Sequence, residues 1–386
     1  MHTIRLAALA LFGALASLAL CASAGAQGFD TSAPHAILLD NDSGTVLFEK
    51  AADEPFPPAS LTKLMTAEYV FSALKKGDLK MDDQFTVSEN AWRKGGAPSG
   101  GSAMFAAIHS SVAVHDLLRG LLVQSGNDAA IVLAEGIAGS ELAFADLMNR
   151  RAAEIGLKGS LFRNSNGLPD PDQHVTARDL AILARHIIAT YPEYYPIFSE
   201  PSFTWNNITQ RNRTPLLDAG IGVDGLKTGY IEASGYGIVS SAVSNGQRLI
   251  LVASGLGSER EREAEARKII EWGFRSFTEH TAFQADEIVG EASVYGGEVG
   301  HVALKANGPV RVLLSRTGGD SLHARVVYQG PLVAPVAAGM QVGALRIWDG
   351  ERLIQETPPF TAGEVGVGKL YQRAFDAVSE LALGWL

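Results

Sequence analysis

The stretch PASLTKLMT, residues 58–66, places a serine and a lysine three positions apart. Apolar residues surround Ser60 and Lys63 and predict the first turn of a helix, on which positions i and i+3 share one face. A serine hydroxyl is a poor nucleophile at neutral pH unless a nearby base takes its proton. A lysine can be that base if its surroundings lower its pKa. Because this spacing is also common on protein surfaces, a catalytic interpretation needs partners elsewhere in the chain.

A second short motif, Ser125-Gly126-Asn127, interrupts an apolar helical stretch. A glycine that ends a helix would account for it without any chemistry. The chemical interpretation is that Ser125 relays a proton, while Asn127 exchanges hydrogen bonds with an amide substrate.

A third motif, Lys227-Thr228-Gly229, lies in GLKTGY, which is predicted to be a strand. An exposed edge strand would also explain a lysine at this place. The functional interpretation has the strand line one side of a cleft. Lys227 then supplies positive charge, Thr228 binds a carboxylate, and Gly229 lets a substrate backbone approach closely.

In this order and in these predicted settings, the three motifs resemble the serine-active penicillin-recognising enzymes. Neighbouring stretches narrow the resemblance to the low-molecular-weight D-alanyl-D-alanine carboxypeptidases: APHAILLDNDSGTVLFEKAADEPFPPASLTKLMT, LLVQSGNDAAIVLAE, NSNGL, VDGLKTGY and WGF. The similarity extends over essentially the whole chain. It implies removal of the terminal D-alanine from peptidoglycan stem peptides, with β-lactams as covalent inhibitors and with no cofactor or metal.

The resemblance also implies roles for the motif residues. Ser60 corresponds to the acylated nucleophile and Lys63 to its general base. Ser125, Asn127 and Lys227 would complete the proton network.

The substrate contacts follow from the same resemblance. Thr228, followed by Gly229, would face the terminal carboxylate of the substrate. The backbone N–H groups of Ser60 and Tyr230 would form the oxyanion hole. Many relatives carry histidine where this chain has Tyr230. The tyrosine keeps the backbone N–H donor, but it does not provide any role that a histidine side chain would have.

A substrate with a free carboxylate also calls for an arginine. Arg262 in EREREAEARK matches the family position, and Arg260 lies two residues before it as the alternative. His174, in the loop PDPDQHVTARD, is a further candidate at the edge of the site.

Several other functions fit parts of this pattern. A class A β-lactamase needs a loop glutamate that activates water, but residues 160–178 contain Asp170 and Asp172 and no glutamate. That class also usually has Ser-Asp-Asn instead of Ser-Gly-Asn, and it lacks a β domain. A D,D-endopeptidase of the same fold and a non-catalytic envelope-binding protein remain as alternatives.

Composition limits the function classes further. The 386 residues are 46% hydrophobic and 19% charged, which indicates a globular chain long enough for two or three domains. The net charge of −10 and the lack of a basic patch argue against a nucleic-acid partner. Histidine and cysteine show no spacing typical of metal ligands.

The N-terminus predicts export. Residues 1–26 contain His2 and Arg5, an apolar run from residue 6 to residue 20, and then small residues, as in a secretory signal peptide. Cleavage after residue 26 or 24 would remove Cys21, the only cysteine. A lipoprotein would use Cys21, but the bulky Leu20 before it disfavours that alternative. The mature protein is therefore expected in the periplasm, without a disulfide.

The elements that must position these motifs form an α+β arrangement. Residues 29–278 are predicted to be a transpeptidase/β-lactamase-like catalytic domain, whose sheet takes strands from both ends of the segment and whose helices lie between them. Short alternating runs over residues 281–360 predict a small all-β domain. TPPFTAGEVGVG is predicted to be a flexible linker.

Residues 364–386 are predicted to end the chain in an amphipathic helix. One face is apolar and the other carries mixed charge, so the segment is expected to lie on a membrane and not to span it. We expect it to hold the protein on the outer face of the cytoplasmic (inner) membrane, with Trp385 at headgroup level. The alternative is a helix docked on the β domain.

Overall fold

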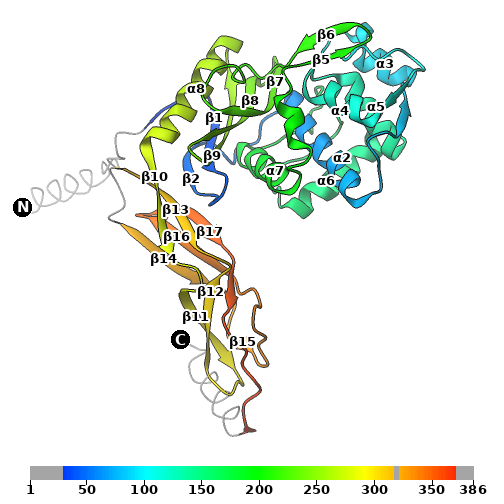
Figure 1. Ribbon diagram of the computed structural model, residues 1–386. Helices are drawn as coiled ribbons and strands as arrows, with labels where there is room; N and C mark the ends of the chain where they lie inside the picture. The colour runs from blue at the N-terminus through cyan, green and yellow to red at the C-terminus, as the bar shows by residue number, and fades with distance from the viewer. Residues whose placement is uncertain (1–28, 317–320, 371–386) are drawn as a thin grey trace, which may run out of the picture. The chain divides into compact units, whose positions relative to one another are not determined.

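The computed structural model describes residues 29–316 and 321–370 (Figure 1). The predicted signal peptide and residues 371–386 of the predicted C-terminal helix lie outside these residues. Among the helices that are described, none combines the length and the apolar character needed to cross a membrane.

One antiparallel sheet takes strands from both ends of the α/β part, as predicted. Its strands are β1 (His35–Asp40), β2 (Val46–Lys50), β7 (Val223–Ile231), β8 (Gly235–Ser244) and β9 (Gln247–Leu256). Their order is β2-β1-β9-β8-β7. Within the described residues β7, which carries the Lys-Thr-Gly motif, is therefore an edge strand.

Both faces of this sheet are covered. Successive side chains of a strand point to opposite faces, so neighbouring residues of β1 pack against different helices. On β1, Ile37 packs in the core with the helices of the middle segment. Its neighbour Leu38 points the other way, toward α8 (Glu259–Ser276), where a Cβ added at Gly273 would lie 2.7 Å from it. The glycine thus lets α8 pack closely on the sheet.

The remaining helices of the α/β part come between its strands in sequence. They are α2 (Lys63–Lys76), α3 (Glu89–Gly95), α4 (Val114–Leu122), α5 (Asn127–Ala138), α6 (Glu141–Ile155) and α7 (Ala177–Thr190), with the 3-10 helices η1 (Ala59–Thr62), η2 (Ala97–Ser99) and η3 (Tyr195–Ser199). Two small antiparallel sheets pair β3 (Gln84–Thr86) with β4 (Ser111–Ala113), and β5 (Ser202–Trp205) with β6 (Ile208–Arg211). Thr176 caps α7, since its hydroxyl accepts a hydrogen bond from the backbone N–H of Asp179 at 3.1 Å.

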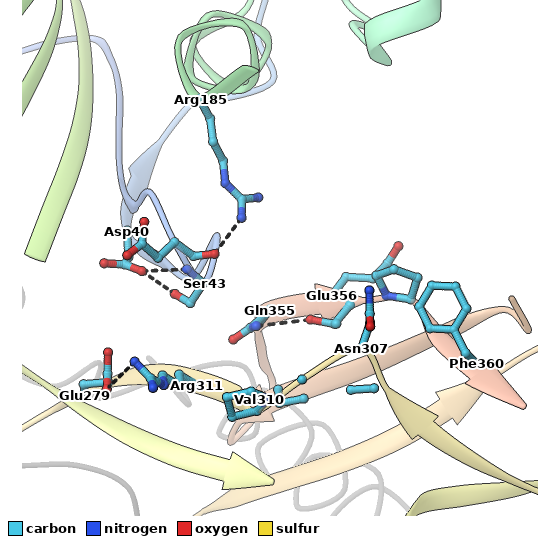
Figure 2. A pocket seen from close by; sticks show the side chains of 16 residues that line it. Asp40, Ser43, Arg185, Glu279, Asn307, Val310, Arg311, Gln355, Glu356 and Phe360 are labelled. Carbon is cyan, nitrogen blue, oxygen red and sulfur yellow. Dashed lines mark hydrogen bonds and ion pairs between the residues drawn. The ribbon is translucent and has the colours of Figure 1, made fainter. Parts of the chain in front are cut away.

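The turn between β1 and β2 is braced from two sides (Figure 2). The backbone N–H and the hydroxyl of Ser43 donate to the Asp40 carboxylate at 2.8 and 2.7 Å. Arg185 of α7 donates to the backbone carbonyl of Asp42 at 2.8 Å. These bonds connect α7, and with it the loop before α7, to the edge of the sheet opposite β7.

The β-rich part contains three small sheets. β10 (Phe277–Phe283) pairs with β13 (Val310–Ser315). A second sheet has the order β15 (Leu332–Val333), β11 (Ile288–Tyr295), β12 (His301–Ala306) and β18 (Pro359–Thr361), and a third has the order β14 (Leu322–Val327), β16 (Ala344–Asp349) and β17 (Arg352–Thr357). The predicted all-β character is confirmed.

The predicted flexible linker is wrong. Val365 forms a β-bridge with Val336, is 4% exposed, and belongs to the β-rich core. A Cβ added at Gly366 would lie 3.0 Å from the Glu298 carboxyl, so this glycine reflects close packing and not flexibility. The backbone N–H of Gly368 also donates to the carbonyl of Gly296 at 2.9 Å. The β-rich part therefore continues past residue 360, and β10 begins it at residue 277 instead of 281. The predicted start of the C-terminal helix at residue 364 is wrong, because Val365 and Val367 form β-bridges.

Candidate active site

Ser60 lies on η1, which leads directly into α2 at Lys63, so the predicted first helical turn is present and has the 3-10 form. A 3-10 helix has three residues per turn, so positions i and i+3 stack directly. The Lys63 ammonium accordingly donates to the Ser60 hydroxyl oxygen at 3.0 Å. Ala59 before them has a φ of 49°, a left-handed conformation that is unusual for alanine.

Close packing holds this unusual turn in place. A Cβ added at Gly167 would lie 1.7 Å from the Ala59 carbonyl oxygen, so only glycine fits there. On the other side, a Cβ added at Gly229 of β7 would lie 3.2 Å from Leu61 and 3.3 Å from Ala59. The two glycines therefore let a loop and an edge strand close around the turn that carries Ser60.

Lys63 is fully buried and has three acceptors. Besides Ser60, its ammonium donates to Asn127 Oδ1 at 2.7 Å and to the Asn166 carbonyl at 2.8 Å. Burial lowers the pKa of Lys63 from 10.5 to about 7, with a further lowering by the charge of Arg213 and an opposing effect from Asp128. A large fraction of this lysine is thus neutral at neutral pH, as a general base requires.

A second lysine and serine form a similar pair. Lys227 is 1% exposed and donates to Ser125 Oγ at 2.8 Å and to the Thr228 carbonyl at 2.9 Å. Burial, followed by the charge of Lys63, lowers its pKa well below the ordinary value. Ser125 has a φ of 60° in the turn between α4 and α5, so its position also depends on a left-handed residue.

Arg262 and Arg260 differ sharply in environment. Arg262 is 6% exposed, and its guanidinium lies 5.7 Å from the centroid of the Tyr236 ring, whereas Arg260 is exposed. Within the described residues, Nε of Arg262 has no hydrogen-bond partner and its guanidinium pairs with no acid. Because a buried charge without a partner is costly, this arrangement suits an incoming anion.

Tyr230 lies on β7 directly after the Lys-Thr-Gly motif, and His174 lies in the loop before α7. Tyr230 is 52% exposed and stacks on Tyr236 with ring centroids 4.2 Å apart. The His174 ring contacts the Asp172 carbonyl at 2.9 Å. In the described part of the chain, no recorded contact joins His174 to Ser60.

Four residues with a part in this geometry were missed by the sequence analysis. Asn166 supplies a carbonyl to Lys63, and Glu141 accepts from the side chains of Ser165 and Asn166 at 3.0 and 3.4 Å. Asp128 accepts from the backbone at residues 104 and 106, which fixes the loop beside Asn127. The position of Asp128 directly after the Ser-Gly-Asn motif is the one sequence signal that could have identified it. The sequence around Arg213 contains no comparable signal.

This arrangement has the groups that serine acyl transfer requires: a serine in contact with a buried lysine, a second serine–lysine pair, and an arginine whose Nε has no hydrogen-bond partner within the described residues. The comparisons identify the family. Residues 22–257 match the family described as D-alanyl-D-alanine carboxypeptidase, and residues 277–366 match the C-terminal domain of penicillin-binding protein 5.

Individual relatives agree with that match. The chain is 38% identical to the D-alanyl-D-alanine carboxypeptidase DacD of Escherichia coli over 343 residues, 88% of each chain. Penicillin-binding protein 5 of Haemophilus influenzae has a solved structure that matches with a TM-score of 0.76 and 37% identity, covering 89% of this chain and 100% of that one. Penicillin-binding protein D2 of Listeria monocytogenes, solved in an ampicillin-bound form, matches with a TM-score of 0.56 and 29% identity, covering 64% of this chain and 99% of that one.

The chain therefore belongs to the D-alanyl-D-alanine carboxypeptidase family. It is a serine-type carboxypeptidase of the low-molecular-weight penicillin-binding type, with a catalytic domain like that of penicillin-binding protein 5 followed by an all-β domain.

Proposed function

We propose that this protein removes the terminal D-alanine from peptidoglycan stem peptides through an ester on Ser60. The observation that carries this assignment is the contact of Lys63 with Ser60 at 3.0 Å, together with the fall of the Lys63 pKa to about 7. A buried neutral lysine in hydrogen-bond contact with a serine supplies the base that the hydroxyl needs.

In the acylation step, neutral Lys63 takes the proton of Ser60 as the oxygen attacks the carbonyl of the penultimate D-alanine. The negative charge that develops on the carbonyl oxygen is stabilised by the backbone N–H groups of Ser60 and Tyr230. When the peptide bond breaks, Ser125 relays the proton that Lys63 took from Ser60 to the leaving amine, which leaves Lys63 neutral again, while Lys227 holds Ser125 Oγ at 2.8 Å. Water then attacks the ester, with Lys63 again as the base, and releases the shortened peptide.

Thr228 and Arg262 hold the substrate by its terminal carboxylate. Arg262 has no acidic partner within the described residues, and a free carboxylate would provide one. An endopeptidase of the same fold would cleave a bond that is not followed by a free C-terminus. The buried, unpaired guanidinium therefore favours the carboxypeptidase over the endopeptidase.

The cellular setting is part of the proposal. Residues 1–26 direct export to the periplasm, and the apolar side chains of the C-terminal segment hold the protein on the outer face of the inner membrane. β-Lactams acylate Ser60 in the same way as the peptide does.

The test compares wild type with Ser60→Ala and Lys63→Ala. Wild type should bind a fluorescent penicillin covalently and release D-alanine from a pentapeptide, and both variants should lose the two activities. Circular dichroism checks that the variants remain folded, and peptide mass spectrometry locates the adduct. A penicillin adduct on any other serine of the Ser60→Ala protein would overturn the assignment.

A further inference from the structure

The three oxygen atoms in hydrogen-bond contact with Lys63 differ in what they can do. Asn127 Oδ1 and the Asn166 carbonyl, at 2.7 and 2.8 Å, can only accept hydrogen bonds, whereas the Ser60 hydroxyl at 3.0 Å can also donate one. A neutral lysine amine has two N–H bonds and one lone pair. When the two N–H bonds go to the two acceptors, the lone pair faces the serine, which is the direction that proton transfer from the hydroxyl requires.

The Asn166 carbonyl belongs to the loop before α7, so its direction depends on the elements that hold this loop. From α2, the Thr66 hydroxyl donates to the carbonyl of Ser165 at 2.6 Å. From α6, Oε1 of Glu141 accepts from Ser165 Oγ at 3.0 Å and from Asn166 Nδ2 at 3.4 Å. Ser165 and Asn166 are 0% and 2% exposed, so the loop is held between two helices by bonds made away from water.

Glu141 is the first residue of α6, and the cap of that helix fixes its place. The Ser140 side chain accepts from the backbone N–H of Ala143 at 3.2 Å. Burial raises the pKa of the Glu141 carboxyl, and the charges of Lys94 and Glu135 act on it in opposite directions. Among the described residues, no basic side chain is recorded as an ion-pair partner of Glu141. A buried carboxylate is costly, and the recorded contacts of this one go to the loop that holds the carbonyl.

We propose that Glu141 is a positioning residue for the general base. Its carboxylate holds Ser165 and Asn166 so that the Asn166 carbonyl takes one N–H of the lysine amine. The lone pair of neutral Lys63 then faces Ser60. This role rests on the proposed function, in which Lys63 takes the serine proton, and Glu141 itself exchanges no proton with the substrate.

Three substitutions separate the reach of the Glu141 side chain from its charge. Glu141→Gln removes the charge but keeps an accepting oxygen in the same place, so the rate of acylation by a penicillin should stay within about threefold of wild type. Glu141→Asp keeps the charge but draws the oxygens back by one methylene group, and Glu141→Ala removes them. Both should slow acylation roughly ten- to a hundredfold, since a misplacement of about 1 Å can cost about a hundredfold in rate.

The pH profile of acylation distinguishes a lost position from a damaged fold. In Glu141→Asp and Glu141→Ala, the Lys63 ammonium loses the Asn166 acceptor, which favours the charged form. The pKa of Lys63 should therefore fall, and the half-maximal rate should move to lower pH by roughly 0.5–1 unit while the plateau rate drops. Glu141→Gln should keep the wild-type midpoint, because the charges that act on Lys63 are those of Arg213 and Asp128.

A double substitution tests whether Glu141 acts through the loop. In Ser165→Ala one of the two contacts is already gone, so adding Glu141→Ala should lower the rate by a smaller factor than it does in wild type. Asp146→Ala removes an exposed carboxylate of the same helix and is the matched control, which should change neither the rate nor the midpoint. Circular dichroism and thermal unfolding check the fold of each variant. If Glu141→Ala does not fold, the comparison of Glu141→Asp with Glu141→Gln still decides.

The outcomes separate a failure of the proposed function from a failure of the positioning role. If wild type is not acylated by a penicillin and releases no D-alanine, the proposed function fails and the positioning role with it. If wild type reacts and Glu141→Asp reacts equally fast, the positioning role alone is refuted. A slower reaction of Glu141→Gln than of Glu141→Asp would show that the charge acts, and a lower rate with an unmoved midpoint would show a merely structural role. Either result would overturn the proposal.

Discussion

The pH dependence of acylation reports the pKa of Lys63, because only the neutral lysine can take the serine proton. Burial and the nearby charge of Arg213 lower its pKa from 10.5 to about 7. That difference corresponds to about 5 kcal/mol between the charged and neutral forms. With such a pKa, about half of Lys63 is neutral at pH 7 and about a tenth at pH 6, compared with about 0.03% at pH 7 for an unperturbed lysine.

We therefore expect the second-order rate constant for acylation by a penicillin to rise with pH and to level off above neutrality. The half-maximal rate should fall near pH 7, and below pH 6 the rate should drop about tenfold per unit. Stopped-flow measurement over pH 5–9 gives the profile. The fold must be checked over the same range, because burial also raises the pKa values of Asp128 and Glu141.

Substitution of Arg213 tests this pKa by removing one of the charges that lower it. Arg213→Gln removes a cation that disfavours the protonated form of Lys63, so the pKa of Lys63 should rise and the profile should move to higher pH. Because Arg213 is exposed, we expect a shift of only roughly 0.2–0.7 pH units. Arg211→Gln makes the same charge change at another exposed position and should leave the profile in place. A half-maximal rate near pH 10, a flat profile, or equal shifts in both variants would refute the reasoning.

Three other predictions follow from the geometry. Gly167→Ala should destabilise the protein by several kcal/mol in urea unfolding, since its Cβ would collide with a carbonyl, while Gly156→Ala, also left-handed but in open space, should cost about 1 kcal/mol. Arg262→Ala should lower kcat/KM about ten- to a hundredfold for peptides with a free C-terminus and much less for amidated ones, with Arg260→Ala as a neutral control. Deleting residues 371–386 should give an active enzyme that no longer pellets with liposomes; a deletion product that still pellets would argue for a docked helix.

Local pattern was enough to predict much of this molecule. The sheet with strands from both ends of its segment, the strand with Lys227 and the all-β second part each depend on short stretches whose chemistry matches their conformation. The grouping of the motifs came from their resemblance to a family. The choice of Arg262 over Arg260 came from the same source, and the difference in burial between the two agrees with it.

What local pattern missed depends on contacts between distant segments. The glycines around Val365 predict flexibility, yet Gly366 is required by the approach of Glu298, which lies 68 positions earlier in the chain. Arg213 affects Lys63 only because a loop far along the chain folds back over the site. No window of sequence contains such information.

The charges of the site explain why both lysines can work as proton carriers. The positive charges of Lys63, Arg213 and Arg262 all lower the pKa of Lys227, while the charge of Asp128 opposes the lowering of the Lys63 pKa. In the free enzyme this excess of cations and the burial favour neutral lysines. A bound carboxylate at Thr228 adds a negative charge next to Lys227, which is adjacent to Thr228 in the chain. We expect that charge to raise the pKa of Lys227 more than that of Lys63. Substrate binding would then leave Lys63 neutral to accept the serine proton and Lys227 charged to support donation to the leaving amine, which is the proton distribution that acylation needs.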